Sequence, residues 1–222
     1  MNIGILGTGP VGETLASALV QQGHRVTMGS RKAGNEKARA WAARTGSDAL
    51  EGSFGDAAAF GEMLFLCVAG AATLEAVRLA GVAHFSGKIV VDVTNPLDFS
   101  KGMPPRILKE YRDVSLGEQV QQLLPKGRVV KALNTMTSRL MVDAQQVGNG
   151  DHELFLCGND PIAKLELIEL LCENFHWRQE HIIDLGDINT AGALEATVPL
   201  WVLLYGQLGT GMFNYKLVQQ TV

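Results

Sequence analysis

The chain opens with NIGILGTGPVG, residues 2–12, and this stretch decides the fold. Its apolar start predicts a strand, Asn2–Leu6, and the glycines that follow have the spacing G-x-G-x-x-G. A helix is expected at residues 10–22 and a second strand at His24–Gly29. A chain with 25 glycines in 222 residues can produce this spacing by chance. Strand, tight turn, helix and second strand within about 30 residues are, however, the context in which the spacing binds a dinucleotide.

Each part of the glycine pattern has a physical role in this interpretation. Gly7 makes the tight turn, Gly9 lets the backbone approach a pyrophosphate, and Gly12 lets the helix pack close to the sheet. The N–H groups at the start of the helix face the phosphates, and a proline there removes an N–H that the helix does not need. We expect the pyrophosphate to be bound by Gly7, Thr8, Gly9, Pro10, Val11 and Gly12. The alternative is a plain glycine-rich turn of an α/β protein.

The residues that follow the second strand indicate which dinucleotide binds. Enzymes that use NAD place an aspartate or glutamate there, which accepts hydrogen bonds from the ribose. This chain has Ser30, Arg31 and Lys32 instead, and its next acidic residue is Glu36. A hydroxyl group and two cations suit the 2′-phosphate of NADP(H), which a carboxylate would repel. We therefore expect NADP(H), with Lys37 as a further contact; the alternative is that Arg31 and Lys32 are solvated loop charges.

Strand-like and helical segments alternate along the rest of the chain. Further strands are expected at residues 48–52, 63–68, 88–93, 128–133, 153–157 and 177–183, and further helices at residues 35–44, 54–60, 73–80, 115–125, 161–174 and 189–205. Residues 95–113 are expected to form a long loop with at most a short helix. The alternation predicts an α/β Rossmann fold, a doubly wound and mostly parallel sheet. We expect residues 1–185 to form this dinucleotide-binding domain and residues 186–222 to form a small helical cap on it.

The carboxyl ends of the other central strands are expected to complete the site. In open α/β sheets ligands lie beyond these ends, which places Val68, Ala69, Asn95 and Asn134 around the nicotinamide. The two asparagines are the polar groups expected to meet its carboxamide or the ribose. The alternative for either asparagine is that it caps a neighbouring helix.

No side chain stands out as a general acid or base. The three tyrosines each lack a lysine four residues later, which counts against the short-chain dehydrogenase mechanism. The five histidines are expected to be surface or packing residues, and Lys164 to be solvated on its helix. We predict no catalytic side chain; hydride transfer between two flat rings needs only stacking in an oriented, dry pocket. The glycine-rich residues 206–211, with Trp201 and Met212, are candidates to line that pocket; the alternative is that they form the core of the cap.

Composition excludes several other classes of protein. The chain is 46% apolar, which excludes disorder, but its apolar runs fall far short of the roughly 20 residues that span a bilayer. Three scattered cysteines and the absence of a visible secretory signal predict a cytoplasmic protein without a metal site. A pI of about 5.7 argues against nucleic acid as a partner. Residues 1–140 carry 16 basic and 12 acidic side chains, whereas residues 141–222 carry 3 and 11, which favours an anionic ligand at the N-terminal part.

Taken together, these motifs resemble those of the deazaflavin (coenzyme F-420)-dependent NADP oxidoreductase family, and they are similar to the soluble NADPH-binding domain of membrane ferric reductases. The resemblance rests on NIGILGTGPVG (2–12), GHRVTMGSRK (23–32), VVKALNT (129–135) and PLWVLLYGQLGTGMFNYKLV (199–218). It implies that residues 8–11 hold the pyrophosphate and that Ser30 and Arg31 hold the 2′-phosphate. Two positions depart from the family pattern. Asn35 stands near its lysine, so Lys32 or Lys37 would replace that lysine, and Ala69 stands where the family has proline.

The first hypothesis for function is an NADPH-dependent oxidoreductase that transfers hydride to a deazaflavin or flavin-like acceptor by direct stacking. The acidic residues 141–222 suit the acidic tail of a deazaflavin poorly, so a neutral flavin, a quinone or a small carbonyl or imine substrate is kept beside it. The alternatives are an imine or pyrroline-carboxylate-type reductase and a non-enzymatic NADPH-binding redox regulator. The partner is expected to be a small molecule, and the sequence leaves open whether the apolar end of the chain also forms a homodimer.

Overall fold

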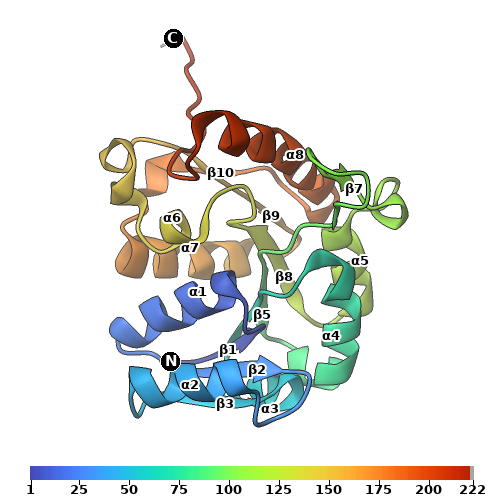
Figure 1. Ribbon diagram of the computed structural model, residues 1–222, viewed down its shortest axis with the longest axis vertical. Helices are drawn as coiled ribbons and strands as arrows, with labels where there is room; N and C mark the ends of the chain where they lie inside the picture. The colour runs from blue at the N-terminus through green and yellow to red at the C-terminus, as the bar shows by residue number, and fades with distance from the viewer. Residues whose placement is uncertain (221–222) are drawn as a thin grey trace.

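The computed structural model describes residues 1–220, in which a central sheet is covered by helices on both faces (Figure 1). The strands of this sheet are β1 (Asn2–Leu6), β2 (Arg25–Ser30), β3 (Ala49–Ser53), β4 (Met63–Leu66), β5 (Ile89–Asp92), β8 (Arg128–Ala132), β9 (Leu154–Gly158) and β10 (Ile182–Asp184). The α-helices are α1 (Pro10–Gln21), α2 (Glu36–Thr45), α3 (Phe54–Phe60), α4 (Thr73–Ala80), α5 (Leu116–Leu123), α6 (Ser138–Met141), α7 (Pro161–Phe175) and α8 (Ala191–Leu208). The predicted α/β fold is confirmed.

The order of the strands is β10-β9-β8-β5-β4-β1-β2-β3, and the six strands from β3 to β8 are parallel. The chain begins in the middle of the sheet at β1, builds outward through β2 and β3, and then returns to the other side of β1 with β4. The connections that follow β1 and β4 therefore leave toward opposite faces of the sheet. A crevice opens between such connections, at the carboxyl ends of the strands.

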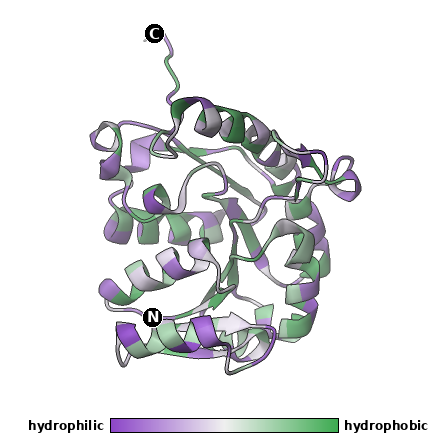
Figure 2. Ribbon diagram, in the orientation of Figure 1, coloured by the Kyte–Doolittle hydropathy of each residue, from purple (hydrophilic) through white to green (hydrophobic). Residues whose placement is uncertain are grey.

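Two apolar layers hold the helices on the sheet, and Figure 2 shows the hydrophobic colour along the central strands between them. On one face, side chains such as Leu15 of α1, Trp41 of α2 and Leu167 of α7 are fully buried. On the other face, α3, α4, α5 and the first half of α8 contribute residues such as Val77 and Leu194. Full burial of one such aliphatic side chain stabilises the fold by about 1.5–3 kcal/mol. The helices are thus held by their apolar faces, and the carboxyl edge of the sheet is left for polar groups.

Strand β9 departs from the parallel pattern, because it runs antiparallel to β8. A parallel return needs a crossover of a dozen or more residues, usually a helix. The connection from β8 to β9 holds only the four-residue helix α6 and short 3₁₀ turns, so it stays at the edge where β8 ends. Strand β10 is parallel to β9, and its carboxyl end therefore lies at the opposite edge of the sheet.

Two other segments differ from the sequence-based expectation. The segment 95–113, expected to be a loop, holds a small antiparallel sheet of β6 (Leu97–Asp98) and β7 (Arg106–Ile107). Helix α8 continues past residue 205 to Leu208, with Pro199 inside it. Residues 214–217 lie beside the start of β9, where the N–H of Glu153 donates to the carbonyl of Tyr215 at 3.0 Å. In the part of the chain that the structure describes, no helix combines the length and apolar character needed to cross a membrane.

Candidate functional site

The turn after β1 has the close contacts that its glycines predict. Gly7 has a φ of +136°, and a Cβ atom there would lie 2.4 Å from the carbonyl oxygen of Cys67, at the end of the neighbouring strand. A Cβ on Gly12 would lie 2.3 Å from the carbonyl oxygen of Gly7. These two glycines are therefore required by the packing of the turn against β4 and of α1 against the turn.

Gly9 differs from both, because a Cβ there would have no heavy atom within 4 Å. It is the N-cap of α1, no side chain caps this helix, and Pro10 occupies its first turn. The first N–H groups of an α-helix have no partner within the helix and carry the positive end of its dipole. The open space beside Gly9 therefore lies at the N-terminus of a twelve-residue helix. An anionic group could bind there, because it needs both free N–H groups and room to approach them.

The loop that follows β2 is held in shape by its own hydrogen bonds. The buried hydroxyl of Ser30 donates to the carbonyl of Lys32 at 2.6 Å, and the N–H of Gly34 donates to the carboxylate of Glu51 at 2.9 Å. The side chain of Asn35 caps α2 by accepting from two of its N–H groups. Asn35 is thus a capping residue, near the position where the sequence resemblance implied a lysine. Within this fixed loop the side chain of Arg31, like that of Lys32, is exposed, and among residues 1–220 neither forms an ion pair.

One cavity of about 530 Å³ joins the two loops. Its walls come from the glycine turn, from the loop after β2, and from the residues that follow β4, with Phe54, Leu79 and Glu75 on the far side. The sequence-predicted residues that line it are Gly7, Thr8, Gly9, Ser30, Arg31, Lys32, Val68 and Ala69. Eight of the thirteen predicted residues are thus brought to one cavity, and Pro10, Val11 and Gly12 form the first turn of the helix beside it. Val68 and Ala69 line the same cavity as the loop after β2, and their predicted place beside the nicotinamide stays a prediction.

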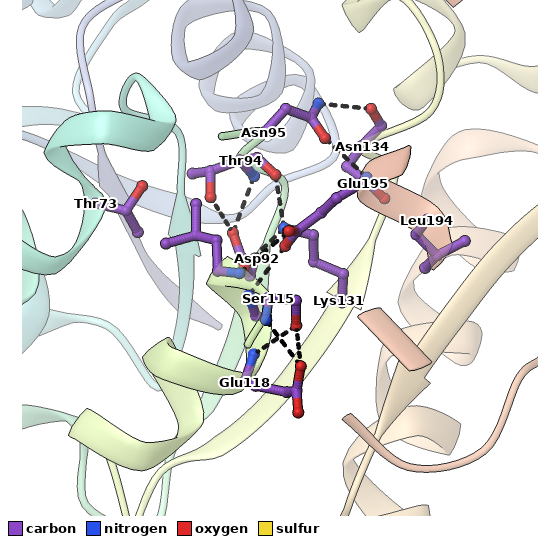
Figure 3. Close-up of polar contacts among 12 residues, drawn as sticks. Thr73, Asp92, Thr94, Asn95, Ser115, Glu118, Lys131, Asn134, Leu194 and Glu195 are labelled. Atoms are coloured by element: carbon purple, nitrogen blue, oxygen red, sulfur yellow. Dashed lines mark hydrogen bonds and ion pairs between the residues drawn. The ribbon is translucent and has the colours of Figure 1, made fainter. Parts of the chain in front are cut away.

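Asn95 and Asn134 lie together at the same edge of the sheet, following β5 and β8 (Figure 3). The side-chain amide of Asn95 donates to the backbone carbonyl of Asn134 at 2.8 Å, and that of Asn134 donates to Oδ1 of Asn95 at 2.9 Å. Because a carbonyl oxygen can only accept a hydrogen bond, these two bonds fix which side-chain atom is nitrogen and which is oxygen in both asparagines. Oδ1 of Asn134 is left as a buried acceptor that has no partner among the described residues. Neither asparagine caps a helix, so that alternative is wrong.

Below this pair lies a buried cluster of charges that the sequence analysis missed. The ammonium of Lys131 in β8 lies 3.0 Å from Asp92 of β5 and 2.9 Å from Glu195 of α8, and all three side chains are at most 2% exposed (Figure 3). Lys131 also donates to the carbonyl of Thr94 at 2.6 Å. Burial alone lowers the pKa of Lys131, but the two carboxylates outweigh it and raise the pKa above its ordinary value, so the ammonium stays charged. The signal for this cluster was an aspartate and a lysine inside otherwise apolar strands, VVDV and VVKA.

Cys67 lies in the wall of the cavity, at the end of β4. Burial of its thiol, with a smaller contribution from the charge of Asp92, raises the pKa of Cys67 far above its ordinary value. The thiolate is the nucleophilic form of cysteine, so this thiol is unreactive at neutral pH. The cavity therefore offers positioning and electrostatics and no nucleophile at this position.

The C-terminal residues proposed to line a pocket for a flat ring are mostly packed on one another. The ring of Trp201 stacks on those of Tyr205 and Phe213, with centroids 5.6 Å and 5.4 Å away. A Cβ on Gly211 would meet Trp201 at 3.3 Å, so this glycine serves packing. However, none of residues 201–220 is buried, and a Cβ on Gly206 or Gly209 would meet no heavy atom within 4 Å, so both interpretations of this segment stay predictions.

Lys164 is not solvated as expected. It is buried in α7, where its ammonium lies 2.7 Å from Asp184 and donates to the carbonyl of Gly186 at 3.2 Å. Helix α7 lies against β8 and β9, and Asp184 ends β10, so Lys164 holds the opposite edge of the sheet from the cavity.

Comparison with known proteins identifies the family. Residues 2–96 match the family model described as NADP oxidoreductase, coenzyme F420-dependent. The F420-dependent NADP reductase of Methanocaldococcus jannaschii is 31% identical over an alignment of 225 positions, which spans 96% of this chain and 97% of the relative. The chain belongs to this family. The resemblance seen in the sequence is therefore confirmed, and with it the class of enzyme, an NADP-dependent oxidoreductase.

Other relatives agree with this membership. A crystal structure from Arthrobacter sp. FB24, named as a candidate F420-dependent NADP-reductase, is 43% identical, covers 99% of this chain and 100% of that one, and has a TM-score of 0.90. The metalloreductase STEAP3 of Rattus norvegicus is 28% identical over 90% of this chain, which matches 37% of STEAP3. An imine reductase from Myxococcus stipitatus, at 16% identity with a TM-score of 0.61, covers 94% of this chain and 63% of that chain, and it shows the shared fold alone.

Proposed function

We propose that this member of the family binds NADP(H) along the cavity and transfers hydride between it and a deazaflavin such as coenzyme F420, or a flavin-like acceptor. The observation that carries the proposal is the single cavity that joins the N-terminus of α1 to a fixed loop bearing Ser30, Arg31 and Lys32. The names of the relatives support both the dinucleotide and the acceptor. A small-molecule partner is proposed accordingly, and the free thiols of Cys67, Cys157 and Cys172 support the cytoplasmic location expected from the sequence.

The residues of the cavity fit a dinucleotide in a definite direction. Arg31 and Lys32 would hold the 2′-phosphate, because among residues 1–220 neither cation forms an ion pair and the first acidic residue after β2 is Glu36. The open space at Gly9 and the N–H groups of α1 would hold the pyrophosphate. The nicotinamide end would then lie beyond β4, toward Asn95 and Asn134, where the unpaired Oδ1 of Asn134 suits a carboxamide N–H. NADPH supplies the hydride when it is bound. The protein would bind the dinucleotide, orient its nicotinamide ring and shield that ring from water.

The loop after β2 gives the test of the cofactor. Arg31→Asp places a carboxylate where the 2′-phosphate would lie, so we expect the affinity for NADPH to fall at least tenfold more than the affinity for NADH, about the value of one charge-assisted hydrogen bond. Arg106→Asp, at an exposed position of β7, is a matched control that removes the same charge outside the cavity. Isothermal titration with both nucleotides measures the difference. Equal loss for NADPH and NADH would contradict the 2′-phosphate assignment.

The acceptor is tested by mixing the protein and NADPH with one acceptor at a time. Stopped-flow absorbance at 340 nm follows NADPH oxidation with a deazaflavin, with a flavin and with a cyclic imine. Rapid oxidation by the deazaflavin or the flavin supports the proposal, whereas oxidation by the imine alone would support the alternative reductase. NADPH binding without oxidation by any of them would support a redox regulator.

A further inference from the structure

The cluster of Asp92, Lys131 and Glu195 links the C-terminal helix to the edge of the sheet where the proposed nicotinamide end would lie. Each member comes from a different element, β5, β8 and α8. The register of the sheet places Asp92 opposite Lys131, so their side chains leave the sheet on the same face. Glu195 is the residue through which α8 enters the cluster, and it is 1% exposed.

The net charge of the cluster is stabilised by backbone N–H groups of α5, which the cluster in turn holds in place. Two carboxylates and one ammonium leave one net negative charge, which needs further donors when it is buried. The N–H groups of Leu116 and Gly117 supply them, because they donate to Glu195 at 3.1 Å and 3.0 Å. They lie in the first turn of α5, where a negative charge is also favoured by the helix dipole. Glu195 therefore holds α8 in place through two contacts, one with the first turn of α5 and one with the ammonium of Lys131.

On the other side, the cluster fixes the backbone that precedes Asn95. Oδ1 of Asp92 accepts from the N–H of Thr94 at 2.9 Å and from its hydroxyl at 2.6 Å, while Lys131 donates to the carbonyl of Thr94 at 2.6 Å. The hydrogen-bonding groups of Thr94 are thus held by two members of the cluster. Asn95 follows directly and is paired with Asn134. The contacts form one continuous path from α8 to the asparagine pair, which Figure 3 shows.

We propose that Lys131 is a positioning residue, which with Asp92 and Glu195 couples the docking of α8 to the placement of Asn95 and Asn134 beside the nicotinamide half of NADP(H). All three N–H donors of the Lys131 ammonium have protein acceptors, so Lys131 acts through Thr94 and does not touch the ligand. The inference rests on the proposed direction of the dinucleotide, but it does not depend on which molecule accepts the hydride.

The coupling predicts a selective defect that loss of stability alone would not give. 2′,5′-ADP carries only the adenosine half of NADP(H), which the proposal places at the loop after β2, whereas NADPH also reaches the asparagine pair. In Lys131→Met we expect the affinity for NADPH to fall about tenfold, as for one lost hydrogen bond, with the affinity for 2′,5′-ADP changed less than about twofold. Turnover should fall further, because misplacement of a reacting group by about 1 Å can cost about 100-fold in rate.

Lys164→Met is the matched control, since it also removes a buried lysine that binds a carboxylate and a backbone carbonyl, but at the opposite edge of the sheet. We expect it to leave the ratio of the two affinities unchanged. If Lys131→Met does not fold, Glu195→Gln carries the test, because it removes one of two carboxylates and leaves the cluster neutral. It should show the same selective loss of NADPH affinity, to a smaller extent.

Isothermal titration of the full chain with NADPH and with 2′,5′-ADP gives both affinities for each variant. The coupling is supported if Lys131→Met or Glu195→Gln lowers only the affinity for NADPH. It is overturned if both ligands weaken by the same factor, or if Lys164→Met produces the same selective loss. A wild-type protein that does not prefer NADPH to NADH would instead contradict the proposed cofactor, so the two failures are distinguishable.

Discussion

The second and third glycines of the G-x-G-x-x-G turn are predicted to fail in opposite ways when each is replaced by alanine. In Gly9→Ala the new methyl group meets no atom within 4 Å, and the φ of −83° and ψ of 178° at this position are open to alanine. Because alanine is a poorer N-cap than glycine, it destabilises the folded state by about 0.5–1 kcal/mol. Alanine also has less conformational entropy than glycine in the unfolded chain, which stabilises the fold by about 0.4–1 kcal/mol. The free energy of unfolding should therefore change by less than about 0.5 kcal/mol.

Binding should change far more in Gly9→Ala. The methyl group occupies the space from which the pyrophosphate would approach the N–H groups of α1, and each charge-assisted hydrogen bond lost there costs about 1.5–3 kcal/mol. We expect the affinities for NADPH and NADH to fall by similar factors, of about 10 to 100.

Gly12→Ala should show the reverse balance of effects. Its methyl group would lie 2.3 Å from the carbonyl of Gly7, so the backbone of the turn or of α1 must move. Overpacking of this kind costs about 1–3 kcal/mol, which for a domain of this size lowers Tm by roughly 2–4 °C per kcal/mol.

Thermal unfolding by circular dichroism and isothermal titration with both nucleotides separate the two effects. The reasoning is refuted if Gly9→Ala keeps wild-type affinity, since the open space at Gly9 would then not be the pyrophosphate site. It is equally refuted if Gly9→Ala loses as much Tm as Gly12→Ala, since the space would then be needed by the fold.

Two further predictions concern other parts of the chain. Hydrogen bonds from Arg128, and then from the first turn of α7, hold the pKa of Asp160 below its usual value, so its contribution to stability is present above about pH 4 and is lost as the pH falls through the lowered pKa. Asp160→Asn keeps a capping group and should cost about 0.5–1 kcal/mol at pH 7, and urea unfolding at a series of pH values should show this difference vanishing in acid. Helix α8 leaves Leu200, Leu203 and Leu208 about half exposed, which supports the homodimer that the sequence left open. Leu203→Glu should then convert a dimer to a monomer in light-scattering chromatography, and a monomeric wild-type protein at tens of micromolar would refute the interface.

Local signals were sufficient to predict much of the fold. The glycine spacing acts over a few residues and helix α1 lies where it was expected, and α5 and α7 lie within or close to the helices expected at residues 115–125 and 161–174. The antiparallel direction of β9 was harder to predict from the sequence. It follows from the absence of a crossover helix between β8 and β9, and nothing in the sequence of β9 itself indicates it. The small sheet of β6 and β7 has two residues in each strand, too few for an alternating pattern to appear.

The residues of the candidate site likewise fall into those that the sequence could predict and those that it could not. Residues of the cavity adjoin one another in sequence at the glycine turn and at Ser30–Lys32, so their chemistry was readable. Glu195 lies 64 residues after Lys131 and more than 100 after Asp92, and only the tertiary fold makes partners of them. Charges inside apolar strands were the one available sign, since a buried charge requires a partner.

The distance along the chain between these partners also orders events during synthesis. The residues of the glycine turn and of the loop after β2 precede residue 36, and Glu51, which holds that loop, follows soon after them. Until α8 has emerged from the ribosome, Lys131, which donates to the carbonyl of Thr94, lacks Glu195, one of its two carboxylate partners. A nascent chain would thus acquire the residues proposed to hold the adenosine end of its nucleotide before the residue that completes the charge cluster beneath the asparagine pair.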